Sequence, residues 1–258
     1  MNYRFIKVEE LFSGGGVQIT LASPPANIIT AAVMKEISAA LAEEEKNKGR
    51  KLVIFSGEGK HFSFGASVEE HKPELVNDML PVFHKMVGDV IACGIPTLAR
   101  VTGLCLGGGF ELALACNFIF ADETTKMGVP EIQLAVFPPV ACILLPLKCG
   151  DGATPHITLT GGQFTAKELR EKGVVNLVAE TGKLDETIAA FYEKEFKPKS
   201  ASSLRIAKKA SVLRFLAEYN KYIGELESLY LKELMSSNDA KEGIAAFIEK
   251  RQPNWKNS

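Results

Sequence analysis

The chain has no excess of charge of either sign. Its 258 residues include 30 Lys and Arg and 31 Asp and Glu, which leaves a formal net charge of −1. A protein that grips a nucleic-acid duplex needs a strong basic excess on one face. The composition therefore argues against nucleic acid as a partner, although Lys208 and Lys209 form a small basic cluster that suffices for a few phosphates.

The sequence also lacks paired cysteines. Their number is odd, and no two of them stand in the Cys-x-x-Cys spacing of a zinc site. Most lie in apolar stretches, which indicates buried, reduced thiols. The cysteines are Cys93, Cys105, Cys116, Cys142 and Cys149. We therefore expect a cytoplasmic protein with no metal site and no disulfide framework.

Long hydrophobic runs are absent as well. No apolar run is long and pure enough to cross a bilayer. The N-terminal text MNYRFIKVEE contains no apolar stretch typical of a signal peptide. We therefore expect no membrane partner. Apolar residues make up 46% and charged residues 24%, which is ordinary for a globular protein, and the length suffices for a large core.

Strand, strand and helix patterns recur along residues 5–178. Alternating apolar residues predict strands, and apolar residues spaced by three or four predict helices. The predicted strands cover 5–22 (as a hairpin), 51–56, 97–102, 117–121 and 174–178. The predicted helices cover 31–48, 76–92, a stretch from about 109, and a short turn near 131. This repetition predicts an α/β fold, a right-handed stack of ββα units with helices outside.

From residue 193 the pattern becomes purely helical. Apolar residues spaced by three or four run from Leu213 through Tyr219 and Tyr230, and a last helix over 239–251 would begin with Asp239 as its N-cap. A tail of this kind has no core of its own and must pack on the spiral or on a neighbouring subunit. We therefore predict two parts, residues 1–192 as the ββα core that holds the site and residues 193–258 as a helical region.

Two glycine-containing turns carry the strongest functional pattern. Residues 61–71 and 103–113 each follow a predicted strand and end where a helix begins. The first N–H groups of a helix have no partner within it, and the helix dipole is positive there. Glycine lets a ligand atom approach the backbone closely. Two such turns facing one another predict an oxyanion hole, in which one donor contributes on the order of 3 kcal/mol to lowering the barrier.

Four stretches of sequence, taken together, point to one family. They are FSFGAS at 62–67, GLCLGGGFELALAC at 103–116, VPEI at 129–132 and EGIAAF at 242–247. With them the chain resembles the enoyl-CoA hydratase/isomerase (crotonase) family over essentially its whole length. The resemblance implies a crotonase spiral, an acyl-CoA thioester as substrate and no separate cofactor. It also implies a C-terminal helical region that builds homotrimers, paired into hexamers.

The same resemblance implies roles for particular residues. The oxyanion donors would be the backbone N–H groups of Ala66 and Gly108. Lys208 and Lys209 are expected near the nucleotide phosphates. The implied substrate-binding residues are Ala26, Phe64, Gly65, Ser67, Gly107, Phe137 and Pro138. Of these, Phe64 and Gly65 should border the adenine and pantetheine groups together with the loop at Ala26.

Two glutamates complete the predicted site. Glu111 and Glu131 stand at the positions of the two acids that flank the bound water in hydratases of this family. One carboxylate must take a proton from water while a neighbouring acid gives one to carbon, and like charges held close raise one pKa. The plain alternative is that each is a solvated acid in the first turn of a helix. Their spacing, and the apolar neighbours of Glu111, favour the catalytic role.

The sequence departs from an ordinary straight-chain hydratase in three places. Ser67 and Asn117 each stand where the family usually has aspartate, and VFPPVACI at 136–143 replaces a glycine-rich stretch that lines the acyl end of the pocket. This stretch and FSFGASVEEH at 62–71 resemble the cyclohexa-1,5-diene-1-carbonyl-CoA hydratases of anaerobic benzoyl-CoA degradation. That resemblance implies 1,4-addition of water to a ring diene, which gives 6-hydroxycyclohex-1-ene-1-carbonyl-CoA, with Phe137 next to the ring.

Other hypotheses stay open at this point. A straight-chain enoyl-CoA hydratase or isomerase fits the same motifs. A nucleophilic serine paired with His61 or His71 is disfavoured because the chain has no Gly-x-Ser-x-Gly elbow. An RNA-binding hydratase homologue would need a basic helix face, whereas the predicted helix over 31–48 is acidic toward its end. A catalytically dead scaffold is disfavoured because both glutamates are present.

Overall fold

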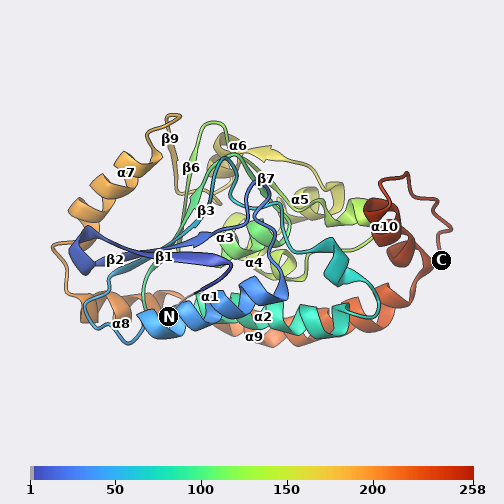
Figure 1. Cartoon of the computed structure of the whole chain (residues 1–258), viewed down its shortest axis with the longest axis horizontal. Helices are drawn as coiled ribbons and strands as arrows, with labels where there is room; N and C mark the ends of the chain where they lie inside the picture. The colour runs from blue at the N-terminus through green and yellow to red at the C-terminus, as the bar shows by residue number, and fades with distance from the viewer. Residues whose placement is uncertain (1–2) are drawn as a thin grey trace.

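The computed structural model describes residues 3–258 as two β-sheets with helices packed around them (Figure 1). The larger sheet has six strands in the order β1 (Ile6–Leu11), β2 (Gly16–Leu21), β3 (Leu52–Gly57), β4 (Thr97–Val101), β6 (Phe118–Asp122) and β9 (Leu177–Ala179). The smaller sheet has three strands in the order β5 (Leu104–Leu106), β7 (Lys126–Gly128) and β8 (Phe164–Thr165). In the larger sheet only β1 runs antiparallel to its neighbour.

Helices make up most of the remaining chain. The α-helices are α1 (Ala31–Glu44), α2 (Val76–Ala92), α3 (Gly108–Ala115), α4 (Pro139–Cys149), α5 (Thr154–Thr160), α6 (Ala166–Glu171), α7 (Leu184–Phe191), α8 (Ala201–Ser211), α9 (Leu213–Ser228) and α10 (Asn238–Ile248). Short 3₁₀ or π segments are η1 (Phe12–Gly14), η2 (Val68–His71), η3 (Pro130–Leu134), η4 (Tyr192–Phe196), η5 (Leu229–Glu233) and η6 (Leu234–Ser236). Within residues 3–258, none of the helices combines the length and apolarity needed to cross a bilayer.

The predicted repetition of ββα units is confirmed. β4 joins the larger sheet, β5 joins the smaller one, and α3 follows them; β6, β7 and η3 repeat the pattern. An isolated parallel bridge between Ser63 and Cys105 attaches the first glycine turn to β5. The two turns that were predicted to face one another are therefore held side by side by backbone pairing.

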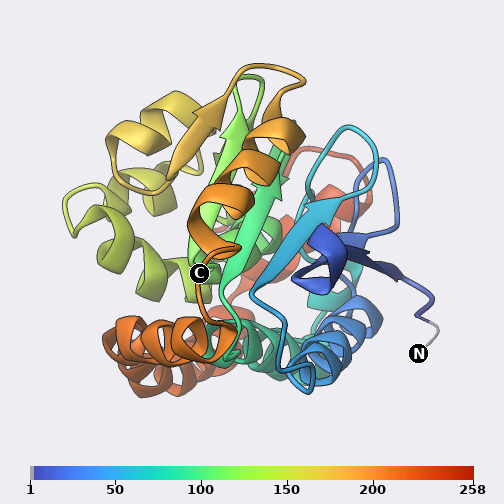
Figure 2. The same ribbon diagram turned by 90° about the vertical axis from the view of Figure 1, so that its left-hand side faces the viewer.

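The larger sheet is buried on both faces. Alternate residues of a strand point to opposite sides, so Val53 and Phe55 of β3 enter the main core with α1, α2 and α3. Leu52 and Ile54 enter a second core with α7, which lies against the other face of the sheet in Figure 2. Burial on both faces is typical of parallel sheets between helices and explains the continuous apolar text of β3.

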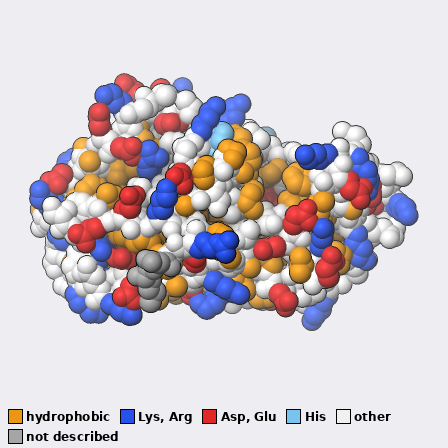
Figure 3. All heavy atoms as spheres, in the orientation of Figure 1, with side chains coloured by type: hydrophobic (Ala, Val, Ile, Leu, Met, Phe, Trp, Pro, Cys, Tyr) orange, Lys and Arg blue, Asp and Glu red, His pale blue; other side chains and the backbone are white. Residues whose placement is uncertain are grey.

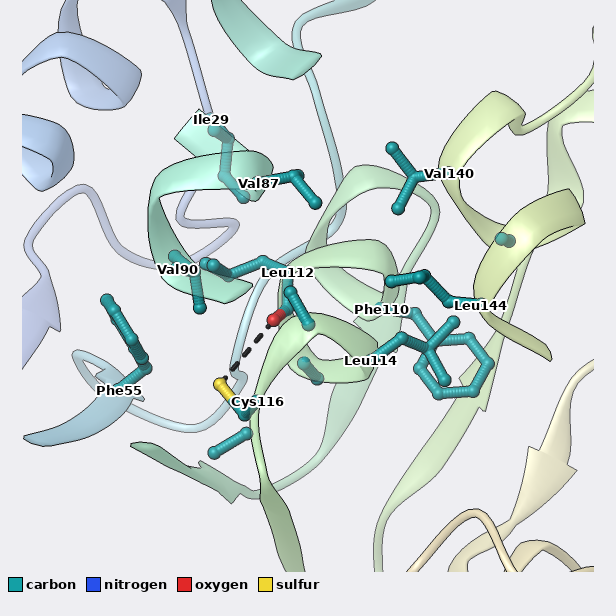
Figure 4. Close-up of a cluster of buried hydrophobic side chains, with 14 of the residues drawn as sticks. Ile29, Phe55, Val87, Val90, Phe110, Leu112, Leu114, Cys116, Val140 and Leu144 are labelled. Carbon is teal, nitrogen blue, oxygen red and sulfur yellow. Dashed lines mark hydrogen bonds between the residues drawn. The ribbon is translucent and has the colours of Figure 1, made fainter. Parts of the chain in front are cut away.

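Helix α3 is buried along its whole length. Figure 4 shows its side chains between those of α2 and those of α4, with Leu112 near the valines of α2 and Leu114 near Leu144 of α4. A helix enclosed in this way is apolar on every side. Glu111 is the exception in α3, and it is only 3% exposed, so the solvated-acid alternative for Glu111 is wrong.

The C-terminal helices pack on the spiral of the same chain. Helix α9 lies beside α2 and α4, below the larger sheet in Figures 1 and 2. The hydroxyl of Tyr219, on α9, donates to the backbone carbonyl of His84 on α2 at 2.7 Å. Segment η4 spans the predicted boundary at 192/193, and its Tyr192 and Phe196 share the second core with β3. The division into a core over 1–192 and a helical region over 193–258 stays a prediction.

Two predicted helix ends were wrong. Helix α1 ends at Glu44, before residue 48. Helix α10 is capped by Ser237, whose hydroxyl accepts from the N–H of Ala240, instead of by Asp239. Asp239 lies two residues after Ser237, in the first turn. Its carboxylate accepts from the backbone N–H groups of Lys256 and Asn257, so the acid holds the chain that follows the helix.

The enclosure of α3 predicts a large stability effect. We expect Leu112→Ala to lower the free energy of unfolding by about 2–5 kcal/mol, because a fully buried side chain leaves a cavity that rigid helices on both sides cannot fill. Denaturant titration measures the change. The control is Leu159→Ala on α5, where the side chain is 69% exposed and the expected change is within about 0.5 kcal/mol. Equal effects of the two substitutions would contradict the packing described.

Candidate active site

A cavity of about 290 Å³ lies where the two glycine turns, η3, the start of α4 and the C-terminal helices meet. It contains nine of the eleven predicted site residues. These are Phe64, Gly65, Ala66, Gly107, Gly108, Glu111, Glu131, Phe137 and Pro138. The structure therefore brings most of the predicted site residues, which lie far apart along the chain, into one cavity.

Ala66 and Gly108, one from each turn, line this cavity. A Cβ atom placed on Gly108 would lie 3.0 Å from the amide nitrogen of Ala66, so the two turns are in contact here. Neither the N–H of Ala66 nor that of Gly108 donates to an acceptor within residues 3–258. Gly65 has φ +111 and would bring a Cβ within 3.0 Å of the Leu106 carbonyl, so the approach of the two turns requires glycine there.

Glu111 is held at the N-terminus of another helix. Its Oε1 accepts from the backbone N–H of Ala141 in the first turn of α4, at 2.9 Å. Burial raises the pKa of Glu111 to about 7, and the hydrogen bonds from the amides of α4 limit the rise because they stabilise the ionised form. The side chain is therefore poised to exchange a proton near neutral pH.

Glu131 faces the same cavity from η3. A Cβ on Gly107 would lie 2.7 Å from its Oε1, so the carboxyl group rests directly on the backbone of the second turn. Its Oε2 is buried and has no hydrogen-bond partner within the described chain. Burial raises the pKa of Glu131 well above its usual range, and the neighbouring charge of Glu111 raises it further. The two carboxyl groups form one titrating pair.

The remaining two predicted substrate-binding residues lie outside this cavity. The carbonyl of Ala26 accepts from the N–H of Phe64 at 2.8 Å, which places the Ala26 loop beside the first turn. Ser67 is 9% exposed, and its backbone carbonyl bonds to Nδ1 of His71 at 2.7 Å. The structure thus brings Ala26 next to the cavity rim and gives Ser67 a role in holding His71.

The expectation that Lys208 lies near nucleotide phosphates was wrong. Lys208 is 5% exposed, and its ammonium group donates to the carbonyls of Ile91 and Cys93 at the C-terminal end of α2. The last carbonyls of a helix have no intrahelical partner and favour a cation, so α8 is anchored to α2 through this side chain. Lys209 is exposed, and its predicted role is untouched by this contact.

The alternative of a serine nucleophile is also unsupported. The hydroxyl of Ser63 donates to the carbonyl of Asn27 at 2.8 Å, and Nδ1 of His61 accepts from the N–H of Leu104 at 3.0 Å. Each side chain holds a neighbouring backbone segment, and no hydrogen bond joins the two. A nucleophile needs a base within hydrogen-bond reach, so this pair lacks the required geometry.

Four polar residues of the cavity, His71, Gln133, Gln163 and Tyr230, were not assigned to the site from the sequence. His71 lines the wall, where the sequence placed it only near the mouth, and burial lowers its pKa. Tyr230 lines the wall from η5, in the C-terminal region. Apolar spacing marked Tyr230 as a buried position, but only the packing of η5 on the spiral shows which group it faces.

The surface gives no electrostatic footprint for nucleic acid on the face drawn in Figure 3, where basic and acidic side chains are interspersed. Helix α1 is acidic near its end, and the Glu44 carboxylate pairs with Arg50 at 2.7 Å. In residues 3–258 no cluster of three or more His, Cys, Asp or Glu side chains is arranged to hold a metal ion. The predicted absence of metal, cofactor and nucleic acid stays a prediction.

Comparison with known proteins identifies the family. The sequence profile of the enoyl-CoA hydratase/isomerase family matches residues 12–258. The chain is 38% identical to a cyclohexa-1,5-dienecarbonyl-CoA hydratase of Thauera aromatica, over 95% of this chain and 94% of that protein. It is 32% identical to a probable enoyl-CoA hydratase of Bacillus subtilis, over 92% of this chain and 94% of that protein.

Solved structures agree on the fold. The structure of an enoyl-CoA hydratase of Mycobacterium avium subsp. paratuberculosis K-10 superposes on this chain with a TM-score of 0.87 at 22% identity. The match covers 99% of this chain and 100% of that one. An enoyl-CoA hydratase of Bacillus anthracis gives 0.76 at 28% identity, covering 99% and 100%. The chain therefore has the crotonase fold and belongs to the enoyl-CoA hydratase/isomerase family. Its named relatives are hydratases, so the chain is a hydro-lyase that acts on a CoA thioester.

The raised pKa of Glu111 predicts a pH-dependent stability. Between about pH 4.5 and 7 the unfolded chain loses this proton while the folded chain keeps it, so the contribution of Glu111 to stability falls as pH rises through that window. Glu111→Gln keeps the Oε1 acceptor for Ala141 and removes the titration. We expect it to raise the free energy of unfolding at pH 8 by about 1–3 kcal/mol and much less at pH 5.

Denaturant titration at the two pH values measures this difference. Glu168→Gln is the control, because hydrogen bonds from Thr165 lower the pKa of Glu168. The stabilisation that ionised Glu168 gives is lost only as pH falls below the usual pKa of a glutamate. Glu168→Gln should therefore lower the free energy of unfolding about equally at pH 5 and pH 8. If Glu111→Gln behaved in the same way, Glu111 would be ionised in the folded protein throughout.

Proposed function

We propose that the chain is a hydratase that adds water to a conjugated cyclic dienoyl-CoA, converting cyclohexa-1,5-diene-1-carbonyl-CoA into 6-hydroxycyclohex-1-ene-1-carbonyl-CoA. The observation that carries the proposal is one small cavity with two unpartnered amides on one wall and two buried carboxyl groups beside them. The similarity to the Thauera aromatica protein supports the choice of substrate.

The two amides supply the electrostatic part of the mechanism. The thioester oxygen accepts hydrogen bonds from the N–H groups of Ala66 and Gly108. Negative charge grows on this oxygen as hydroxide adds to the β carbon, so the donors bind the transition state more tightly than the substrate. Their positions are fixed by the contact between the two turns before substrate arrives.

The two glutamates supply the proton transfers. Glu111 ionises first, because amides of α4 donate to it while Oε2 of Glu131 has no donor. Ionised Glu111 takes a proton from water, and the water oxygen bonds to the β carbon to give a dienolate. Neutral Glu131 then gives its proton to the far end of the diene. One molecule of water is consumed, and transfer of a proton from Glu111 to Glu131 then restores the starting pair.

The wall near the carboxyl groups favours a flat ring. Phe137 and Tyr230 face one another with ring centroids 5.4 Å apart, and Pro138 lies beside them in the cavity. Prolines 138 and 139 stiffen this segment and start α4, with Pro139 at the first helical position. A rigid aromatic wall matches the shape of a cyclic diene better than that of a flexible chain.

The C-terminal helices expose apolar side chains that support an oligomer. Leu213 on α9 and Ile206 on α8 are 68% and 69% exposed in the single chain. Apolar side chains exposed on neighbouring helices support a homotrimer or a homohexamer formed partly through the C-terminal region. A cytoplasmic location stays a prediction from the cysteine pattern.

Steady-state kinetics tests the choice of substrate. We expect kcat/KM for the cyclic dienoyl thioester to exceed that for crotonyl-CoA by at least about tenfold, since a pocket shaped for one acyl group discriminates by its contacts in the transition state. Phe137→Leu should reduce this preference, whereas Phe191→Leu, on α7 against the far face of the sheet, should preserve it. Faster turnover of crotonyl-CoA would favour the straight-chain hydratase instead.

Substitution of each glutamate tests the chemistry. Glu111→Gln and Glu131→Gln should each lower kcat by about 10²–10⁴-fold, because proton transfer is lost, while affinity for the thioester survives. Binding of a non-reactive acyl-CoA, measured by calorimetry, checks the second part. Glu44→Gln, which breaks the pair with Arg50 away from the cavity, should leave kcat unchanged. Near-normal rates in both active-site variants would rule out the acid and base assignment.

A further inference from the structure

One polar group in the cavity has no role in the mechanism above. Tyr230 is only 1% exposed, and its buried hydroxyl has no hydrogen-bond partner within residues 3–258. A buried hydroxyl without a partner destabilises the folded state. Tyrosine is therefore a poor choice for simple packing here, where phenylalanine would fill the same space. A ligand that forms a hydrogen bond with this hydroxyl would remove the destabilisation.

The surroundings fix where that ligand would lie. The ring of Tyr230 packs between Phe137, at 5.4 Å, and His71, at 6.4 Å, measured between ring centroids. Nδ1 of His71 is already bonded to the Ser67 carbonyl. Burial raises the pKa of Tyr230, and the charges of Glu131 and then Glu111 raise it further. Tyr230, Glu111 and Glu131 line the same cavity.

The two orphaned atoms are complementary. The Tyr230 hydroxyl offers a donor, and Oε2 of Glu131 offers an acceptor; both are buried and both lack partners in the described chain. A single hydroxyl group or water placed between them would accept from the tyrosine and donate to the carboxyl oxygen. An unsaturated acyl chain has no atom that satisfies both, whereas water and an alcohol do.

We propose that Tyr230 is a substrate-contacting residue whose hydroxyl, together with Oε2 of Glu131, holds the oxygen atom that is added to or removed from the acyl group. This inference rests on the proposed hydratase function. In hydration, one proton of the held water goes to Glu111, its oxygen bonds to the β carbon, and its second proton stays on the oxygen and faces Glu131. In dehydration, Tyr230 donates to the departing hydroxide.

The tyrosine acts as a donor throughout and never as a base. Its proton is held more firmly than in a free phenol because the anion would stand beside two carboxyl groups. The donor therefore stays in place while the glutamates exchange protons. It also gives the site a contact that is specific for the hydroxylated thioester.

Tyr230→Phe tests the proposal, with Tyr219→Phe as the matched control. Both residues are buried tyrosines of the C-terminal helices, but the Tyr219 hydroxyl donates to the His84 carbonyl outside the cavity. Tyr230→Phe should lower kcat for hydration by about 10–100-fold with KM for the unsaturated thioester changed less than about twofold. Tyr219→Phe should keep kcat within about twofold even if it lowers thermal stability.

Binding separates this inference from the hydratase proposal, because it needs no turnover. Calorimetry with the hydroxylated thioester and with its saturated, non-hydroxylated counterpart should show an affinity loss of about tenfold in Tyr230→Phe for the first ligand alone. Unchanged kcat with unchanged affinities would overturn the role of Tyr230, as would equal losses for both ligands. A wild-type protein that hydrates neither cyclic nor straight-chain thioesters would overturn the hydratase proposal, and the binding comparison would still decide the contact.

Discussion

The burial of two carboxyl groups in one small cavity is the constraint on which the site depends. Burial raises the cost of ionising both groups, and the charge of Glu111 raises it further for Glu131. The protein tolerates this cost because α3 is locked between α2 and α4 and cannot turn Glu111 toward water. A core built for rigidity is thus also what keeps two acids from being solvated.

The surroundings of the two acids differ in a way that divides the work between them. Glu111 lies at the N-terminus of α4, where an amide donates to it and the helix dipole favours negative charge. Glu131 has an oxygen with no donor, so its neutral form is favoured. Similar side chains thereby acquire different proton affinities from backbone geometry alone. The segment that holds Glu111, around Pro139, also shapes the aromatic wall, so acyl-chain shape and acid strength are set by one stretch of sequence.

Local sequence predicted those parts of the site that depend on local geometry. Glycine turns between strand and helix predicted a pair of free amides, and the family resemblance assigned them to Ala66 and Gly108, whose N–H groups have no partner in residues 3–258. Lys208 was misjudged because its partners, the last carbonyls of α2, belong to a helix more than a hundred residues away. Ala141 was missed as a donor to Glu111 although Pro139 is a typical helix start. Tyr230 was recognised as buried, but apolar spacing does not say what a side chain faces.

The cavity wall draws on residues from Phe64 to Phe247, which has a consequence during synthesis of the protein. A ribosome that has released the chain only as far as α9 has already delivered both amides and both glutamates. The segment with Tyr230 and helix α10 is still missing at that stage, so one wall of the cavity has not yet been built. An enclosed binding site therefore exists only after the last helices of the chain have docked.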